Sequence, residues 1–196
     1  MKRIFDILAS GAGLLVLSPV FAIVALWIKF DSRGPVFYRQ TRVGRHNKDF
    51  GLLKFRSMVV GADKKGLITV GGRDPRVTRS GYFIRKYKLD ELPQLVNVFW
   101  GHMSLVGPRP EVRKYVDLYT PEQLHVLDVR PGITDLASIR YRNENELLAQ
   151  ADDPDRYYVE VIMPDKLRIN LEYVARQSFW YDLKLIFMTF REIVPK

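Results

Sequence analysis

The 196-residue sequence has no cysteine and only three histidines. Without cysteine, the chain forms no disulfide bond and has no thiolate nucleophile, which is compatible with a reducing compartment. Three scattered histidines argue against a zinc site, because zinc is held by clusters of histidine, cysteine and carboxylate ligands. The sequence also has no internal repeat and no low-complexity tract. Its chemistry must therefore depend on carboxylates and cations.

Acidic residues are outnumbered by basic ones. The chain has 31 Lys and Arg against 22 Asp and Glu, a formal net charge of +9 and a pI near 9.7. This balance favours partners that carry phosphate: nucleic acid, anionic lipid or nucleotides. After the first apolar segment about 165 residues remain, which is enough for one domain with a sizeable core.

An uncharged, mostly apolar run of 22 residues extends from Ile7 to Ile28, with Ser18 and Pro19 in its middle. A straight helix of this length would reach ~33 Å and cross a ~30 Å hydrocarbon core. Pro19 argues against a straight helix, since it lacks an N–H and its ring clashes with the carbonyl of Leu15. The break leaves two arms, residues 7–17 and 20–30, each too short to span. The run predicts a membrane-bound chain.

Basic residues flank this run on both sides, and basic flanks favour the cytoplasmic side of a membrane. The flanking cations are Lys2, Arg3, Lys29, Arg33, Arg39 and Arg42. A re-entrant hairpin satisfies both flanks, whereas a proline-kinked spanning helix leaves one set on the other side; these residues alone leave both alternatives open. A cleaved signal peptide fits less well, because the run is long and residues 31–34 offer no small-residue cleavage site.

The remaining pattern predicts an α/β fold that is mostly helical with a small β-hairpin. Strands are expected at residues 36–41 and 50–55 around a turn at 44–48, and a loop at 61–74. Helices are expected at residues 79–88, 92–100, 165–176 and 178–194, and another opens at Thr120-Pro121 toward Val129.

The last expected helix has an amphipathic pattern, with large apolar residues at spacings of three and four. Trp180 and Tyr181 add rings of the kind that lie at lipid headgroups. An ordinary core helix and an interfacial membrane helix both fit this pattern. The residues alone are thus compatible with a re-entrant helix-break-helix and amphipathic interfacial helices, or with a kinked spanning helix and an ordinary core helix.

Two adjacent carboxylates, Asp90 and Glu91, follow a run of cations and precede Pro93. Proline is tolerated best in a first helical turn, so the pair is expected at a helix N-terminus, where carboxylates and phosphates are both favoured. Adjacent helical residues point ~100° apart, so the two side chains would take different roles. One could attack phosphorus while the other holds a divalent metal; the alternative is ordinary capping at the surface.

The order of the motifs decides between these interpretations. The sequence contains, in this order, Lys54-Phe55-Arg56-Ser57-Met58, Leu89-Asp90-Glu91-Leu92-Pro93-Gln94-Leu95, Met103-Ser104-Leu105-Val106-Gly107-Pro108-Arg109-Pro110 and Arg130-Pro131-Gly132-Ile133-Thr134. Behind a broken apolar segment, this set resembles the bacterial sugar transferases, the monotopic phosphoglycosyl transferases. The resemblance covers essentially the whole chain.

The resemblance implies a reaction and a location. Such enzymes move a sugar 1-phosphate from a UDP-sugar to polyprenyl phosphate, release UMP and so begin glycan assembly. They use Mg²⁺ and a covalent aspartyl-phosphosugar intermediate. The implied organisation is a re-entrant anchor, residues 1–33, at the cytoplasmic face of the bacterial inner membrane, and a catalytic domain, residues 34–196. The expected partners are UDP-sugar, polyprenyl phosphate and the membrane but no nucleic acid, and self-association is left open.

The resemblance also assigns residues. It implies that Asp90 is the nucleophile and Glu91 the metal ligand, and that Ser18 and Pro19 form the membrane break. The substrate-binding positions that it implies are Lys54, Arg85, Arg109, Arg142 and Asn170.

The chain departs from the family pattern in the stretch after Thr134 and at Asn170. Residues 139–143 differ from the usual glycine-bearing version, although Arg142 and Asn143 match. Many relatives have glycine and glutamine where this chain has Asp135 and Ser138, and an aspartate where it has Asn170. Asn170 is neutral and cannot supply that charge. These departures put direct transfer of this part of the site in doubt, and the sequence does not reveal the sugar.

Another acidic motif, Asp153-Pro154-Asp155, resembles a nucleotide-sugar metal motif, but its loop composition favours a solvated turn. Two other classes of function are weighed against the transferase. One is a membrane-anchored module that binds anionic lipid or nucleic acid; the other is a family member that has become an inactive scaffold. The basic module does not need the Asp90–Glu91 pair, and the intact set of site residues argues against the scaffold.

Overall fold

The computed structural model describes residues 1–66 and 74–193. Its helices are α1 (Lys2–Val16), α2 (Ser18–Asp31), α3 (Arg79–Lys86), α4 (Gln94–Trp100), α5 (Arg113–Val116), α6 (Leu136–Arg140), α7 (Glu144–Ala149), α8 (Pro154–Tyr157), α9 (Met163–Arg176) and α10 (Phe179–Ile193). Its strands are β1 (Phe37–Val43), β2 (Asp49–Phe55), β3 (Ser104–Val106) and β4 (Gly132–Thr134). The predicted mostly helical α/β class is confirmed. Part of the predicted loop at 61–74 lies outside the described residues, as does the last predicted helical residue, Val194.

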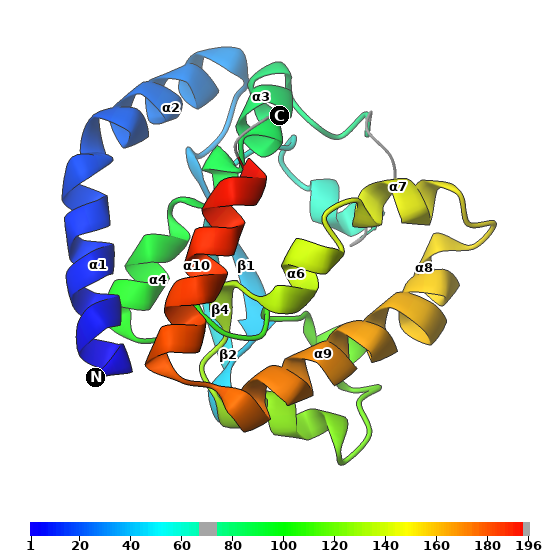
Figure 1. The fold of residues 1–196 in the computed structure, drawn as a ribbon. Helices are drawn as coiled ribbons and strands as arrows, with labels where there is room; N and C mark the ends of the chain where they lie inside the picture. Colours follow the sequence, from blue (N-terminus) through cyan, green and yellow to red (C-terminus); the bar gives the residue numbers. More distant parts are fainter. Residues whose placement is uncertain (67–73, 194–196) are drawn as a thin grey trace.

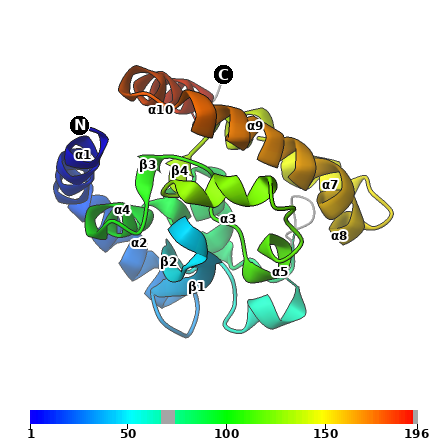
Figure 2. The ribbon, with the colours of Figure 1, turned by 90° about the horizontal axis from the view of Figure 1, so that it is seen from below.

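The elements form layers around two small sheets. Figure 1 shows α1 and α2 along one side of the molecule and α9 crossing the opposite end. Figure 2, seen from below, shows α9 and α10 as one layer over the sheets. The sheets therefore lie between the N-terminal and C-terminal helices.

β1 and β2 form the predicted antiparallel hairpin, with Phe37 opposite Phe55 and Val43 opposite Asp49. The predicted end of the first strand, at residue 41, is wrong. Val43 is 1% exposed and its N–H donates to the Glu111 carbonyl, so tertiary contacts extend the strand. The hairpin carries Lys54 near the end of β2.

A second sheet, not predicted, joins the two glycine-proline motifs. β3 and β4 are parallel, with Ser104 opposite Gly132. A Cβ on Gly132 would lie 2.1 Å from the Gly107 nitrogen, so only glycine allows this close approach of backbones. The pairing places the turn that carries Arg109 beside the start of α6.

The predicted helix at Thr120 begins as expected and then differs. The Thr120 N–H donates to Gln123 Oε1 at 2.9 Å, and the Gln123 N–H donates to Thr120 Oγ1 at 3.2 Å. These reciprocal bonds form a capping box. The segment continues as a 3₁₀ helix, Gln123–Asp128, rather than an α-helix.

α1 and α2 are bent by 60° at Leu17. Pro19 lies in the first turn of α2, and the Leu15 carbonyl accepts a 2.8 Å hydrogen bond from Ser18 Oγ. The serine hydroxyl thus satisfies the carbonyl that Pro19 cannot reach. In the described residues no single helix is long and apolar enough to cross a membrane, but the bent pair together meets the criteria of length and hydropathy.

The N-terminal end of the bent pair is fixed to the rest of the molecule. Lys2 Nζ forms an ion pair with Asp182 and donates to the Tyr173 hydroxyl at 3.0 Å. The Arg3 guanidinium donates to the carbonyls of Val98 and Phe99 at the end of α4.

The C-terminal end of the bent pair is fixed as well. Asp31 accepts hydrogen bonds from the Ser80 N–H and hydroxyl at the start of α3. The Arg56 guanidinium, on the segment after β2, donates to the carbonyls of Ser32, Arg33 and Pro35. Both ends of the bent pair therefore lie on the same body of protein.

Candidate active site

A cavity of about 960 Å³ brings together most of the predicted site. Six predicted residues line it: Lys54, Arg85, Asp90, Glu91, Arg109 and Arg142. They come from the hairpin, α3, the turn before α4, the turn after β3 and the segment after α6. The fold therefore gathers side chains that lie up to 88 positions apart, from Lys54 to Arg142.

The two carboxylates lie in a 3₁₀ turn, Leu89–Glu91, immediately before α4. Lys88 enters this turn with a left-handed φ of 56°, a conformation that is uncommon for residues other than glycine. Pro93 then caps α4. The expectation of a helix N-terminus was thus close, but the pair occupies the preceding turn.

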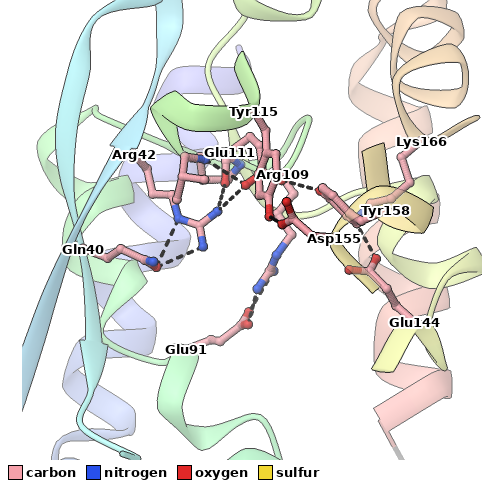
Figure 3. Close-up of polar contacts among 12 residues, drawn as sticks. Gln40, Arg42, Glu91, Arg109, Glu111, Tyr115, Glu144, Asp155, Tyr158 and Lys166 are labelled. Atoms are coloured by element: carbon pink, nitrogen blue, oxygen red, sulfur yellow. Dashed lines mark hydrogen bonds and ion pairs between the residues drawn. The ribbon is translucent and has the colours of Figure 1, made fainter. Parts of the chain in front are cut away.

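Glu91 forms a two-bond ion pair with Arg109, with Nη2–Oε1 at 2.5 Å and Nη1–Oε2 at 3.2 Å (Figure 3). Burial acts to raise the pKa of the Glu91 carboxyl, but the charges of Arg109 and Lys54 outweigh burial and hold it well below its usual range. The Glu91 charge in turn raises the pKa of Arg109. Both groups therefore stay ionised at any physiological pH.

Asp90 has a different environment. It is 8% exposed, and its Oδ1 is buried without a hydrogen-bond partner. Burial and the neighbouring Glu91 charge raise the pKa of the Asp90 carboxyl, against the opposing charges of Lys54 and Arg85. A buried carboxylate oxygen without a donor keeps its lone pairs for another atom. Asp90 thus has one buried oxygen available to a bound ligand.

Lys54 lies on β2 and faces the same cavity. Burial lowers the pKa of its amine to about 8, although the Glu91 charge opposes this change. Its ammonium group is therefore charged at neutral pH and loses its proton in mildly alkaline solution. Lys54 is a cation whose charge depends on pH near the physiological range.

A clamp fixes the turn that carries Arg109, and the sequence did not predict it. Arg42 Nη1 donates to the Pro110 carbonyl at 3.0 Å and to Glu111 Oε1 at 2.9 Å. Glu111 Oε2 accepts from the Tyr158 hydroxyl at 2.5 Å. Figure 3 shows Arg42 held between Gln40 and Glu111. The clamp sets the direction in which the Arg109 side chain leaves the turn.

Arg42 was predicted only as a cation flanking the membrane run. In the structure it also lines the cavity, on the wall formed by β1 together with Gln40. Its position on the hairpin was a signal that could have assigned it to the site. Lys54 lies opposite Tyr38, and the alternation along a strand places Arg42 on the same face as Tyr38.

The two departures at Asp135 and Ser138 form one structural unit. Asp135 is fully buried, caps α6 and accepts hydrogen bonds from the Ser138 N–H at 2.9 Å and the Ser138 hydroxyl at 2.6 Å. Ser138 lines the cavity, and the Asp135 charge contributes to the raised pKa of Arg109. Each residue therefore supports the other.

Asn170 does not line the large cavity and meets only one other predicted site residue, Arg109, in a smaller one. It lines a separate cavity of about 40 Å³ behind the Arg109 turn, with Tyr158 and Lys166. Asn170 is 5% exposed, and its Oδ1 has no hydrogen-bond partner. A cavity of this size holds one or two water molecules rather than a sugar nucleotide.

The other acidic motif is structural. Asp153 caps α8 by accepting from the Arg156 N–H, and Asp155 pairs with Lys114 at 2.7 Å and with the Tyr115 hydroxyl at 2.6 Å. The predicted solvated turn is the better description, and neither residue lines the large cavity.

One carboxylate of the pair, Glu91, fits a magnesium ion held jointly with a substrate. Within residues 1–66 and 74–193, no group of three or more His, Asp or Glu side chains is placed to hold a metal. Magnesium is commonly bound by one or two carboxylates together with substrate phosphates and water. Glu91 fits such a site, because each of its oxygens accepts one hydrogen bond from Arg109 and keeps a second lone pair for a metal ion.

The family model for bacterial sugar transferases matches residues 1–196. The chain is 39% identical over 203 residues to the UDP-glucose:undecaprenyl-phosphate glucose-1-phosphate transferase of Escherichia coli (strain K12), covering 100% of this chain and 41% of the relative. It is 39% identical over 197 residues to the UDP-N-acetylgalactosamine-undecaprenyl-phosphate N-acetylgalactosaminephosphotransferase of Aeromonas hydrophila, covering 99% of this chain and 44% of the relative. It is 40% identical over 196 residues to the exopolysaccharide production protein PSS of Rhizobium leguminosarum bv. phaseoli, covering 96% of this chain and 92% of the relative. The chain thus spans less than half the length of the first two.

Proposed function

The chain belongs to the bacterial sugar transferase family, and from this membership we propose that it transfers a sugar 1-phosphate from a UDP-sugar to undecaprenyl phosphate and releases UMP. The names of two relatives describe this type of transfer with different sugars, and a third is named for exopolysaccharide production. The proposed product would begin assembly of a bacterial polysaccharide. The observation that carries the proposal is the buried Asp90 among cations in one cavity.

The first proposed step is attack by an ionised Asp90 oxygen on the β-phosphorus of the UDP-sugar. A bond forms between that oxygen and phosphorus, and the bond from phosphorus to the bridging oxygen breaks. UMP leaves with the bridging oxygen and the bonding electrons. Asp90 suits this role because one of its oxygens has no hydrogen-bond partner.

In the second proposed step, a phosphate oxygen of the acceptor attacks the same phosphorus. The bond from phosphorus to Asp90 breaks, and the carboxylate is regenerated. Because the transfer is divided into two steps, only one anion attacks the phosphorus atom in each step. Repulsion between anions is still large, so fixed positive charge is needed in both steps.

Arg85, Arg109 and Lys54 would supply that charge. The planar guanidinium fork of arginine matches two phosphate oxygens at once, and Arg109 already makes such a paired contact with Glu91. Glu91 would hold Mg²⁺, which when bound neutralises phosphate charge. Arg142 lines the same cavity and is proposed to contact the nucleotide sugar. Asn170 is proposed to act through ordered water behind Arg109.

We further propose that residues 1–33 form a re-entrant anchor at the cytoplasmic face of the inner membrane, with residues 34–196 catalytic. Two observations support re-entry: the 60° bend at Leu17, and the contacts that Lys2 and Asp31 make with the same body of protein. A spanning helix would separate those two residues by the thickness of the membrane.

Mass spectrometry tests the mechanism. Protein incubated with UDP-glucose or UDP-N-acetylgalactosamine and Mg²⁺, without acceptor, is expected to gain one phosphosugar on the peptide that contains Asp90, and to release an equal amount of UMP. Asp90→Asn should lose both signals while keeping its circular dichroism spectrum. Asp152→Asn, a change at an exposed position, is the matched control. A wild-type enzyme that turns over without ever carrying the adduct would contradict the covalent route.

The same assay separates the rival functions. A lipid-binding or nucleic-acid-binding module would show binding that weakens with salt but no UMP release. An inactive scaffold would show neither the adduct nor UMP release with any donor sugar.

A further inference from the structure

The large cavity has an apolar part that the catalytic residues do not use. We name this part the α1–α10 groove. Its lining residues are Phe5, Ala9, Gly13, Leu17, Leu92, Leu95, Leu105, Ile133, Ile186 and Phe190. The same continuous cavity contains the Asp90–Glu91 pair and the site cations, so an occupant of the groove would extend directly into the charged site.

α1 forms one wall of the groove with a single face. Phe5, Ala9, Gly13 and Leu17 recur every four residues and together cover about 18 Å of helix. The two middle positions have the smallest side chains, so α1 adds little side-chain volume to the groove at its centre. A Cβ on Gly13 would already lie 3.3 Å from Leu95 Cδ1, so a larger side chain there would fill the groove.

The two helices are joined at one end and open at the other. Near their N-terminal ends, the rings of Phe5 and Phe179 pack edge to face at 5.4 Å, and Lys2 pairs with Asp182. Figure 1 shows α1 and α10 running in the same direction from this contact. At the other end Phe190 is 65% exposed, so the groove reaches the surface between Leu17 and Phe190.

We propose that the α1–α10 groove binds the hydrocarbon chain of the polyprenyl phosphate acceptor, with its phosphate at Asp90 and its chain leaving between Leu17 and Phe190. This inference rests on the proposed function. One cavity contains both a long apolar trough and, at its end, a cluster of cations. Such a cavity fits a single ligand with an anionic head and an apolar tail. A nucleotide sugar offers no such tail.

The exposed surface near the mouth agrees with an occupant that comes from a membrane. Leu15 and Val16, which directly precede Leu17 on α1, are large apolar residues with exposed side chains. With the exposed Phe190 on α10, they place apolar surface on both helices at this end of the groove. A prenyl chain that left the groove here would pass into lipid without crossing water.

Chain-length preference tests the proposal. The wild-type enzyme should use a long-chain polyprenyl phosphate with a much lower KM than a short prenyl phosphate. Gly13→Leu should raise the KM for the long-chain substrate by about ten-fold or more, because excluding two methylene groups from the groove weakens binding by about that factor. The KM for the short prenyl phosphate should not change. Ala12→Leu adds the same side chain at an exposed neighbouring position and should behave as wild type.

A second pair of variants does not depend on helix packing. Phe190→Ala should weaken the long-chain preference, whereas Phe187→Ala should not, since both rings are exposed but only Phe190 lines the cavity. A polyprenyl phosphate with a photoreactive terminal unit should label peptides of α1 or α10 in the wild type and not in Gly13→Leu.

Two outcomes separate the groove from the proposed function. The groove assignment would be overturned if Gly13→Leu and Phe190→Ala kept the full chain-length preference. It would also be overturned if a photoreactive phosphatidylglycerol labelled the groove and polyprenyl phosphate did not displace it. Normal UMP release from UDP-sugar without acceptor in all four variants would leave the proposed function standing. Failure of the wild type to release UMP with any donor would instead remove the function itself.

Discussion

Arg109 and Glu91 meet as a two-bond ion pair across the cavity, at 2.5 and 3.2 Å. The contact joins the turn after β3 to the turn that carries Asp90. Arg109 thus has a carboxylate partner before any phosphate arrives, and a phosphate must share or replace that partner. The pair sets the distance between the proposed nucleophile and the proposed phosphate ligand.

Replacing Arg109 should distinguish charge from geometry. Arg109→Lys keeps the positive charge but loses the fork, so we expect kcat/KM for UDP-sugar to fall by about 10²-fold, or about 3 kcal/mol. Arg109→Ala should be worse, because it also leaves Glu91 buried without its partner. Steady-state UMP release measures both. Equal activity of Arg109→Lys and wild type would show that the fork is not needed.

The activity should depend on pH through two groups. Asp90 must lose its proton to attack, and its pKa is raised, so activity should fall on the acid side as the pH drops through that value. Lys54 must keep its proton to offset phosphate charge, and its pKa is about 8, so activity should fall as the pH rises above about 8. Arginine stays charged at this pH, so Lys54→Arg should move the alkaline decline upward. If the activity of Lys54→Arg and of the wild type fell at the same alkaline pH, the alkaline decline would belong to a group other than Lys54.

Arg42 should act through the Arg109 turn. Arg42→Lys loses part of the fork that holds Pro110, Glu111 and Gln40, so Arg109 would be less fixed. We expect kcat to fall by about ten-fold with little change in the melting temperature, since a loosened positioning group costs on the order of 1–2 kcal/mol in the transition state. Arg39→Lys, at an exposed position on the same strand, is the control. If Arg42→Lys lowered the free energy of unfolding by as much as it raised the activation free energy, the role of Arg42 would be purely structural.

Gly132 should be essential for stability. Its Cβ would meet the Gly107 nitrogen at 2.1 Å, so Gly132→Ala must separate β3 from β4, at a cost of about 3 kcal/mol in the free energy of unfolding. Gly11→Ala, where the nearest atom is 3.4 Å away on a flexible ring, should stabilise α1 by about 0.5–1 kcal/mol. Thermal unfolding compares the two. A stable Gly132→Ala variant would show that the strands can part freely.

The topology can be mapped with single cysteines, because the natural chain has none. A cysteine inserted after Met1 and one at exposed Lys48 should both be protected from an impermeant reagent in intact cells and both react in inverted vesicles. Pro19→Leu should straighten the bend and expose the inserted cysteine in intact cells. Labelling of the wild-type N-terminal cysteine from outside would rule out re-entry.

The sequence predicted the hairpin and the broken apolar segment well, because each rests on local rules, and it placed Asp90 one turn too late. Alternating residues indicate the strands, and Pro19 cannot continue a helix whose carbonyl at Leu15 it would strike. The structure adds that Ser18 satisfies that carbonyl.

Contacts between distant segments could not be predicted in this way. The β3–β4 pair has three residues in each strand, too few for any periodic signal, and it depends on two glycines 25 positions apart. Arg42 belongs to the clamp only because β1 passes beside the turn at Pro110. Asn170 was grouped with the site by resemblance, yet it lies in a separate cavity because α9 packs behind the Arg109 turn.

The proposed anchor is also part of the folded core. Val24 and Ile28 on α2 are 3% and 0% exposed and pack against Phe55 and Ile84. Removing residues 1–33 to obtain a water-soluble enzyme would therefore expose the ring of Phe55, one position from Lys54, and loosen the strand that carries this cation. The proposed anchor therefore cannot be exchanged independently of the rest of the fold. A chimaera with another protein's anchor must reproduce these packing contacts or lose the active site with them.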